Sequence, residues 1–142
     1  MYNFNMERTL AIIKPDAVAA RDVGAIIGRI EQNELRVVAL RSVCLTREAA
    51  EGFYVVHRGK PFFDSLTAFM SSGLAVVLVL EAPEAIRRWR DLMGATDPSK
   101  ADEGTLRREF GTSIDRNATH GSDAIDTAAY EVSYFFPGVE LR

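Results

Sequence analysis

The segment LAVVLVL, residues 74–80, is the longest uninterrupted apolar run in the chain and decides the fold. An amphipathic strand alternates apolar and polar residues, whereas this one is apolar on both faces. A strand of that kind is buried on both sides. We therefore predict that residues 74–80 form a central strand of a sheet.

Two further strands are predicted N-terminal to this segment. TLAIIK, Thr9–Lys14, is a short apolar run that stops at Pro15, whose ring cannot donate to a strand ladder. LRVVALRSV, Leu35–Val43, is rich in β-branched residues, which favour strands. A further short strand is expected before the last helix.

Helices are predicted between and after these strands. Apolar residues recur at helical spacing, caps and helix formers mark the starts, and Gly73 suits a stop. The expected helices cover Arg21–Asn33, about 46–56 with Thr46 as N-cap, the segment 61–73, Ala85–Met93, and a last helix with Ile125, Ala129, Val132 and Phe136 on one face. Residues 94–119 have no sustained period, and a loop of that length in a compact domain is usually functional.

This order of elements predicts an α/β (α+β) sandwich on a split β-α-β pattern, with helices covering an antiparallel sheet. A doubly wound parallel fold is the competing architecture, and the pattern alone leaves both open. The chain of 142 residues is expected to be one domain, 1–142. MYNFN, or residues 1–7 at most, is expected to be a short N-terminal extension.

Composition excludes several functional classes. A net charge of −3 argues against nucleic acid as the main partner, because phosphate backbones favour basic surfaces. No apolar run approaches the roughly 18 residues that a membrane span needs, and the start lacks a secretory pattern, so we expect a cytoplasmic protein without a membrane partner. Cys44 is the only cysteine; it excludes an internal disulfide and is expected to be a buried core thiol.

The stretch NATHGSD, residues 117–123, holds the strongest chemical signal. It places His120, one of two histidines, shortly before the last helix, where oriented N–H groups favour anions. Gly121 removes side-chain bulk beside the ring, and Ser122 is able to hydrogen-bond a nearby acid. Glu131, about two turns into the helix, is a candidate to hold one ring nitrogen while the other acts as a nucleophile. By itself, His120 also fits a capping or surface histidine.

Several other polar residues would complete a phosphate site. Lys14 ends an apolar strand, Arg90 and Arg107 carry guanidinium forks that match phosphate oxygens, and Thr96 offers a hydroxyl. Lys14 also fits a strand-end charge that reaches out to water, and Arg90 and Arg107 matter only if both turn inward. His57 has no supporting constellation and is interpreted as surface or structural. Since the Gly-rich phosphate loop G-x-x-x-x-G-K-[ST] is absent, any phosphate site must be built from arginines, a lysine and a helix end.

Five motifs in order resemble the nucleoside diphosphate kinase family. They are IIKPDAV at 12–18, FYVVHRGKPFF at 53–63, RDLMGATDP at 90–98, GTLRREF at 104–110 and NATHGSD at 117–123. The similarity extends from about Arg8 to Phe136, and the N-x-x-H-G-S-D segment is highly specific for the family.

The resemblance implies a ferredoxin-like sandwich that moves a γ-phosphoryl group between nucleoside triphosphates and diphosphates such as ATP, GTP, ADP and GDP. It implies ping-pong chemistry through a phosphohistidine, broad base tolerance, a homo-oligomer (tetramer or hexamer), and Mg²⁺ held mainly by nucleotide phosphates and water. Carried over by motif, the roles are nucleophile for His120, ring orientation for Glu131 and Ser122, active-site groups for Lys14 and Tyr54, phosphate contacts for Arg90, Thr96 and Arg107, ribose contact for Asn117, and base stacking for Phe62.

The chain departs from the family pattern at a few positions. Asp97 stands where the family usually has Asn, which predicts slightly weaker nucleotide binding through an added negative charge. Leu74 replaces a common proline, with an effect expected only on strand entry. Ala118 and Thr119 replace larger apolar residues, which predicts looser packing behind His120.

Two other functional classes compete with an active kinase. A non-catalytic interaction or regulatory module would be expected to lose His120, Lys14 or Arg107, and all three are present. An auxiliary activity on nucleic acid or as a protein-histidine kinase gains no support from the acidic composition.

Overall fold

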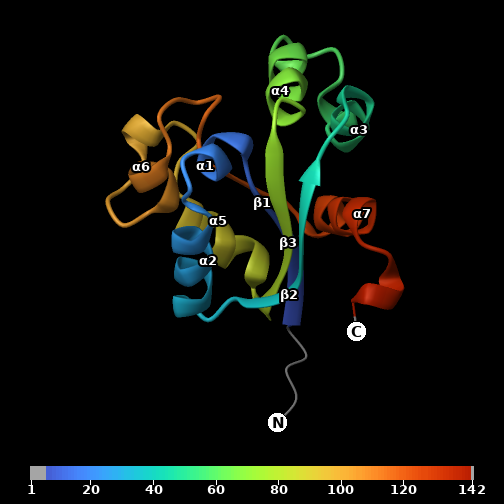
Figure 1. Ribbon diagram of the computed structural model, residues 1–142. Coiled ribbons are helices and arrows are strands. Elements are labelled where there is room, and N and C mark those ends of the chain that lie inside the picture. The colour runs from blue at the N-terminus through green and yellow to red at the C-terminus, as the bar shows by residue number, and fades with distance from the viewer. Residues whose placement is uncertain (1–5, 142) are drawn as a thin grey trace.

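The computed structural model describes residues 6–141 and shows a four-stranded antiparallel sheet in the order β2-β3-β1-β4 (Figure 1). The strands are β1 (Met6–Ile13), β2 (Arg36–Cys44), β3 (Leu74–Pro83) and β4 (Thr119–Gly121). β3 lies between β1 and β2, as the segment LAVVLVL predicts. Every strand pair is antiparallel. This pairing confirms the ferredoxin-like sandwich and excludes the doubly wound parallel alternative.

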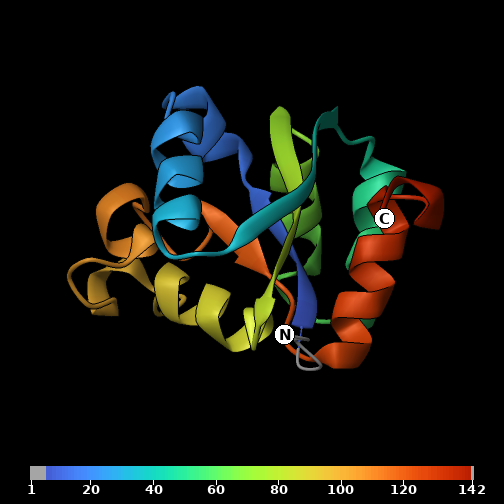
Figure 2. The same ribbon diagram turned by 90° about the horizontal axis from the view of Figure 1, so that it is seen from below.

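Helices cover both faces of the sheet. Figures 1 and 2 show α1, α2, α5 and α6 on one side of the sheet and α3, α4 and α7 on the other. The helices are α1 (Pro15–Ala19), α2 (Val23–Gln32), α3 (Arg47–Phe53), α4 (Phe63–Met70), α5 (Ala85–Met93), α6 (Leu106–Phe110) and α7 (Ile125–Phe135), with 3₁₀ turns at Val55–His57, Pro98–Lys100 and Gly138–Glu140.

The sheet divides the core into two layers, because successive side chains of a strand point to opposite faces. In β1, Ala11 and Ile13 join the layer that includes Trp89 of α5. Leu10 and Ile12 join the other layer, beneath α3, α4 and α7. Residues 9–13 of β1 are fully buried, so the end of the strand that leads toward α1 lies in the core.

Several expected boundaries differ in the structure. Pro15 ends β1 but also opens α1, because proline suits the first helical turn and needs no backbone donor there. Met6 and Glu7 pair with Pro83 and Ala82, so the expected extension is wrong for these two residues. Residues 1–5 lie outside the described part of the chain. The loop 94–119 contains α6, a 3₁₀ turn and the first residue of β4.

Two expectations about burial are also corrected. Cys44 is exposed, since it is the last residue of the edge strand β2. Val132 and Phe136 of the expected face are buried, but Ile125 is 72% exposed and Ala129 is exposed, and Ala128 faces the core in their place. The helical period is right, but the buried stripe is rotated. The cause is tertiary: Glu131 has to face β4, which turns Ile125 outward.

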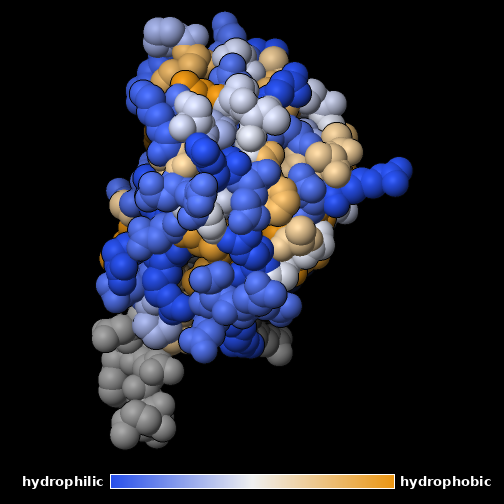
Figure 3. All heavy atoms as spheres, turned by 90° about the vertical axis from the view of Figure 1, so that its left-hand side faces the viewer, coloured by the Kyte–Doolittle hydropathy of each residue, from blue (hydrophilic) through white to orange (hydrophobic). Residues whose placement is uncertain are grey.

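The outer surface over α1, α2, α5 and α6 is mostly hydrophilic, with small apolar patches between charged side chains (Figure 3). Within residues 6–141, no helix combines the length and apolarity needed to cross a membrane.

Candidate active site

A cavity of about 400 Å³ opens at the end of the sheet where β1 leads into α1. Eight of the ten residues singled out from the sequence line this cavity. The other two, Glu131 and Ser122, lie behind His120. The lining residues from that set are Lys14, Tyr54, Phe62, Arg90, Thr96, Arg107, Asn117 and His120. They come from segments spread over the whole chain, which only the folded sheet brings together.

His120 lies on the short strand β4, where it pairs with Ile12 of β1. It does not stand directly at a helix start, because α7 begins at Ile125. The N–H groups of Asp123 and Ala124 donate to Thr127 Oγ1 at 3.2 and 2.9 Å. These donors are therefore occupied, and the expected anion site at the helix N-terminus is not what surrounds His120.

A hydrogen-bonded chain holds the imidazole from behind. His120 Nε2 lies 2.9 Å from Glu131 Oε1, and Ser122 Oγ donates to the same oxygen at 2.8 Å. Ser122 Oγ also accepts from the Leu10 N–H of β1 at 3.2 Å. With a carboxylate as its partner, Nε2 carries the proton, and this leaves the lone pair on Nδ1.

Aromatic rings restrict the imidazole further. Phe53 and Tyr54 contact its ring edge-on, with centroids 5.3 and 5.8 Å away. Within residues 6–141, Nδ1 forms no hydrogen bond. The ring is thus fixed through one nitrogen and available to a ligand through the other.

Gly121 lines the cavity beside His120 and also allows close packing against α5. A Cβ at this position would lie 2.6 Å from both Trp89 Cδ1 and Met93 Cε, which is shorter than any normal contact. Trp89 Nε1 in turn donates to the His120 carbonyl at 3.1 Å. The glycine therefore lets α5 pack directly behind the histidine, a second requirement that the sequence interpretation of Gly121 did not include.

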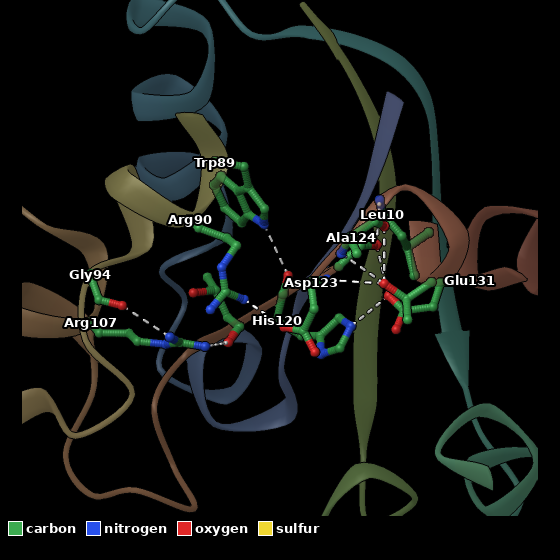
Figure 4. Close-up of polar contacts among 12 residues, drawn as sticks. Leu10, Trp89, Arg90, Gly94, Arg107, His120, Asp123, Ala124 and Glu131 are labelled. Atoms are coloured by element: carbon green, nitrogen blue, oxygen red, sulfur yellow. Dashed lines mark hydrogen bonds and ion pairs between the residues drawn. The ribbon is translucent and has the colours of Figure 1, made fainter. Parts of the chain in front are cut away.

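Two arginines face His120 from the side opposite Glu131 (Figure 4). Arg107 donates to the carbonyls of Gly94 and Thr119 at 3.0 and 2.9 Å, while its Nε is buried without a partner among the described residues. Burial, together with the nearby charge of Arg90, lowers the pKa of Arg107 to about 10. Arg107 stays charged at neutral pH and is rigidly held.

Arg90 is held differently. It is more exposed, and its Nη1 forms an ion pair with Asp123 Oδ1 at 2.7 Å. An exposed pair of this kind is weak and exchanges easily with another anion. The structure thus supplies one fixed guanidinium and one that can change partners.

Lys14 approaches the cavity from the end of β1. Its Nζ donates to Asn117 Oδ1 at 2.8 Å, and Asn117 Nδ2 donates to the Thr96 carbonyl at 3.0 Å. Burial lowers the pKa of Lys14 to about 8, with Arg107 contributing, while Asp16 and Asp115 oppose the shift. The lysine is a cation at neutral pH but close to losing its proton.

The aromatic side of the cavity includes a residue that the sequence interpretation missed. His57 lines the cavity, stacks on Tyr54 with centroids 6.2 Å apart, and lies 5.2 Å from the ring of Phe62. Burial and Lys60 lower the pKa of His57. Its spacing of three residues from Tyr54, typical of one helix face, was the available signal. Phe62 itself is 44% exposed at the mouth.

Asp97 does not line the cavity. Its Oδ1 accepts from the Ser99 N–H and hydroxyl at 3.0 and 2.8 Å, and these bonds lower the pKa of the carboxyl group. The side chain caps the 3₁₀ turn at Pro98–Lys100. An asparagine oxygen accepts hydrogen bonds equally well, so this departure from the family pattern keeps its structural role.

The site combines a histidine of fixed tautomer with two guanidinium groups and a lysine. This arrangement is typical of enzymes that transfer phosphoryl groups, since that reaction needs alignment and charge neutralisation. The comparisons with known proteins agree. A family model described as nucleoside diphosphate kinase matches residues 7–141. The chain belongs to the nucleoside diphosphate kinase family, and phosphoryl transfer between nucleotides is its activity.

Individual relatives cover nearly the whole chain. The nucleoside diphosphate kinase of Syntrophotalea carbinolica is 62% identical over 96% of this chain and 99% of its own length, and that of Desulfotalea psychrophila is 59% identical over the same shares. The solved structure of the Aquifex aeolicus enzyme is 42% identical, with a TM-score of 0.94 over 96% of this chain and 99% of that one. The Halobacterium salinarum enzyme, solved in complex with CDP, is 38% identical, with a TM-score of 0.91 over 96% and 91%.

Proposed function

We propose that His120 Nδ1 is the nucleophile of a two-step transfer, in which the protein carries the γ-phosphoryl group as a phosphohistidine. The observation that carries this proposal is the asymmetry of the ring. Nε2 is bound to Glu131 at 2.9 Å, while the same side chain lines a cavity that also contains Arg90, Arg107 and Lys14.

The electron balance of the two steps is simple. The Nδ1 lone pair of His120 attacks the γ-phosphorus, the bond to the bridging oxygen breaks, and the diphosphate leaves with that electron pair. A terminal oxygen of a second nucleoside diphosphate then attacks the phosphorus, and the N–P electron pair returns to Nδ1. Arg90, Arg107 and Lys14 neutralise charge on the phosphate oxygens in both steps, which is where this reaction needs help.

We assign the contacts with the rest of the nucleotide to residues that line the cavity. Phe62 stacks on the base, Asn117 contacts the ribose, Thr96 contacts a phosphate, and the buried Tyr54 shapes the floor beside His120. An aromatic face reads no hydrogen-bonding edge of a base. This supports broad tolerance among ATP, GTP and the other nucleoside triphosphates and diphosphates.

Magnesium fits this cavity as an ion that arrives with the nucleotide. Asp115 and Asp123 are carboxylates in the lining, and no group of three metal-binding side chains occurs within residues 6–141. Mg²⁺ commonly keeps several waters and uses phosphate oxygens with one or two carboxylates, so the donor set suits it. When bound, the ion would neutralise phosphate charge, and Asp123, the carboxylate that pairs with Arg90, could accept hydrogen bonds from its waters.

A homo-oligomer, tetramer or hexamer, is supported by exposed apolar side chains. Leu40 on the edge strand is 50% exposed, and Ile125 and Ala129 line an open apolar hollow along α7. Light scattering on the purified protein measures the mass directly. A cytoplasmic location stays a prediction of the sequence.

The nucleophile is tested by labelling with γ-³²P-ATP. Wild type is expected to retain acid-labile, alkali-stable label, and His120→Ala none. His57→Ala is the matched control, because it removes the other histidine of the cavity and leaves Nδ1 of His120 in place. Label retained by His120→Ala would contradict the proposal, and an unlabelled wild type would favour the non-catalytic alternative.

A further inference from the structure

The chain makes a strained turn immediately before the proposed nucleophile. Ala118 has φ of 73°, and the Thr119 N–H donates to the Asn117 carbonyl at 2.8 Å across it. This is the rarer form of γ-turn, whose central φ lies near about +75° and is unfavourable for a residue with a Cβ. Such a conformation persists only where the surroundings enforce it.

The turn connects two parts of the site. Before it, Asn117 receives the Lys14 ammonium and bonds the Thr96 carbonyl. After it, Thr119 and His120 pair with Ile13 and Ile12 of β1. The angle of the turn therefore sets where Asn117 stands relative to the imidazole.

Two groups from the segment after β1 hold this turn. The Lys14 N–H donates to the Ala118 carbonyl at 2.8 Å, and the Ala118 N–H donates to Asp16 Oδ2 at 3.0 Å. Ala118 is completely buried, so no water replaces a lost partner. An unpaired buried N–H is costly, and Asp16 is its acceptor.

We propose that Asp16 is a positioning residue for phosphoryl transfer, which holds Ala118 in its left-handed conformation and thereby fixes Asn117 and His120 relative to each other. The proposal rests on the functions proposed above for Lys14, Asn117 and His120. Asp16 lies within the motif IIKPDAV, but no function was assigned to it from the sequence, and it does not line the cavity because its carboxylate acts from behind the turn.

The charge of Asp16 has a second, separable effect. The charged groups that face Lys14 are Asp16 and Asp115, which favour its protonated form, and Arg107, which opposes it. Lys14 and Arg116 also lie over the ring of Phe69. Removing the Asp16 charge lowers the pKa of Lys14 further below about 8, so the lysine loses its proton at a lower pH.

The experiment compares Asp16→Ala with Asp16→Asn, and uses Glu31→Gln on the exposed side of α2 as the matched loss of one negative charge. We measure kcat/KM across pH 6 to 10 together with circular dichroism. At pH 6.5, Asp16→Ala should lose about tenfold, the effect of one unpaired buried donor, and Asp16→Asn less than about threefold because it keeps an acceptor. In both variants the alkaline fall of kcat/KM should begin at a lower pH, and in Glu31→Gln it should not move.

A rescue separates positioning from general stability. Glycine adopts positive φ freely, so Ala118→Gly in the Asp16→Ala background should recover about threefold or more, and alone should change kcat/KM less than about twofold. Equal activity of Asp16→Ala and wild type, or no recovery in the double variant, would overturn the proposal. If Asp16→Ala does not fold, an unshifted alkaline fall in Asp16→Asn overturns the charge effect. Lys14→Gln is measured alongside: an unimpaired Lys14→Gln refutes the function of Lys14 instead.

Discussion

The two sides of His120 are built on different principles. On one side, the Leu10 N–H, Ser122 Oγ, Glu131 Oε1 and His120 Nε2 form a hydrogen-bonded chain in which each of these four groups already has a partner inside the protein. On the other side, donors face a cavity, and some are unpaired or weakly paired: Arg107 Nε has no partner among the described residues, and Arg90 is bound to an exposed carboxylate.

This difference separates orientation from binding. A closed hydrogen-bonded chain fixes the tautomer and direction of the imidazole without any ligand, so that no reorganisation is needed when the phosphate arrives. Donors with spare capacity instead gain from the ligand. We call the side of Glu131 and Ser122 the support side, and the side of Arg90, Arg107 and Lys14 the binding side. Variants on the support side should therefore lower kcat, and those on the binding side should lower kcat/KM.

The largest effect is expected at Arg107. Arg107→Ala should lower kcat/KM by about 10²–10³-fold, because it removes a preorganised cation and leaves the Gly94 and Thr119 carbonyls unpaired. The neighbouring Arg108→Ala is the matched control, since that side chain is exposed and reaches only the Ser99 carbonyl. Steady-state kinetics with ATP and a range of diphosphates measure both. Similar losses in the two variants would refute the distinction between them.

A smaller effect is expected behind the ring. Glu131→Gln should lower kcat about tenfold with little change in KM, since an amide still accepts from Nε2 but no longer stabilises its proton by charge. Asp126→Asn, on the exposed side of the same helix, is the control. A rise in KM without a fall in kcat would show that Glu131 belongs to the binding side.

The pH dependence sharpens the comparison, because the cavity side of His120 contains Lys14, whose pKa burial lowers to about 8. Lys14 holds its proton below pH 8 and loses it above, so the affinity for ADP should fall about tenfold per pH unit well above the pKa of about 8. Calorimetric titration from pH 7 to 9.5 measures this. Constant affinity over that range would exclude Lys14 as a phosphate contact.

The smallest effect is expected at Asp97. Asp97→Asn should tighten ADP binding less than about twofold, because the carboxylate is directed at Ser99 and not into the cavity. The same calorimetric assay is sufficient. Clearly weaker binding would mean that the charge of Asp97 supports the loop beyond its capping role.

Most of the fold was predictable because local rules and burial agree there. The apolar run at 74–80 could only be an inner strand, and Thr46 caps α3 by accepting the Ala49 N–H, as predicted. The prediction of a buried Cys44 failed because position in the sheet, not local hydrophobicity, makes β2 an edge strand. The predicted face of α7 was right for Val132 and Phe136 but wrong for Ile125 and Ala129, because the contact of Glu131 with His120 of β4 fixes the rotation of the helix.

The candidate site was predictable in its residue types but not in its geometry. Motif resemblance identifies the groups that meet in the cavity. It assigns no function to His57, which lies in a 3₁₀ turn and contacts Tyr54 and Phe62, nor to Asp16, whose partner Ala118 is 102 positions away. The interpretation of Gly121 as space beside the ring likewise did not include the close packing of Trp89 and Met93, which excludes a Cβ at that position.

The sequence by itself determined the secondary structure, the central strand, the family and the set of reactive groups, because each depends on residue type and spacing. Only the tertiary structure decided which nitrogen of His120 is free, which arginine is rigid and how the Ala118 turn is held. These properties depend on contacts between distant segments, such as Ile12 with His120 and Asp16 with Ala118. Such contacts form only when β1 and β4 pair and exclude water from both faces of the sheet.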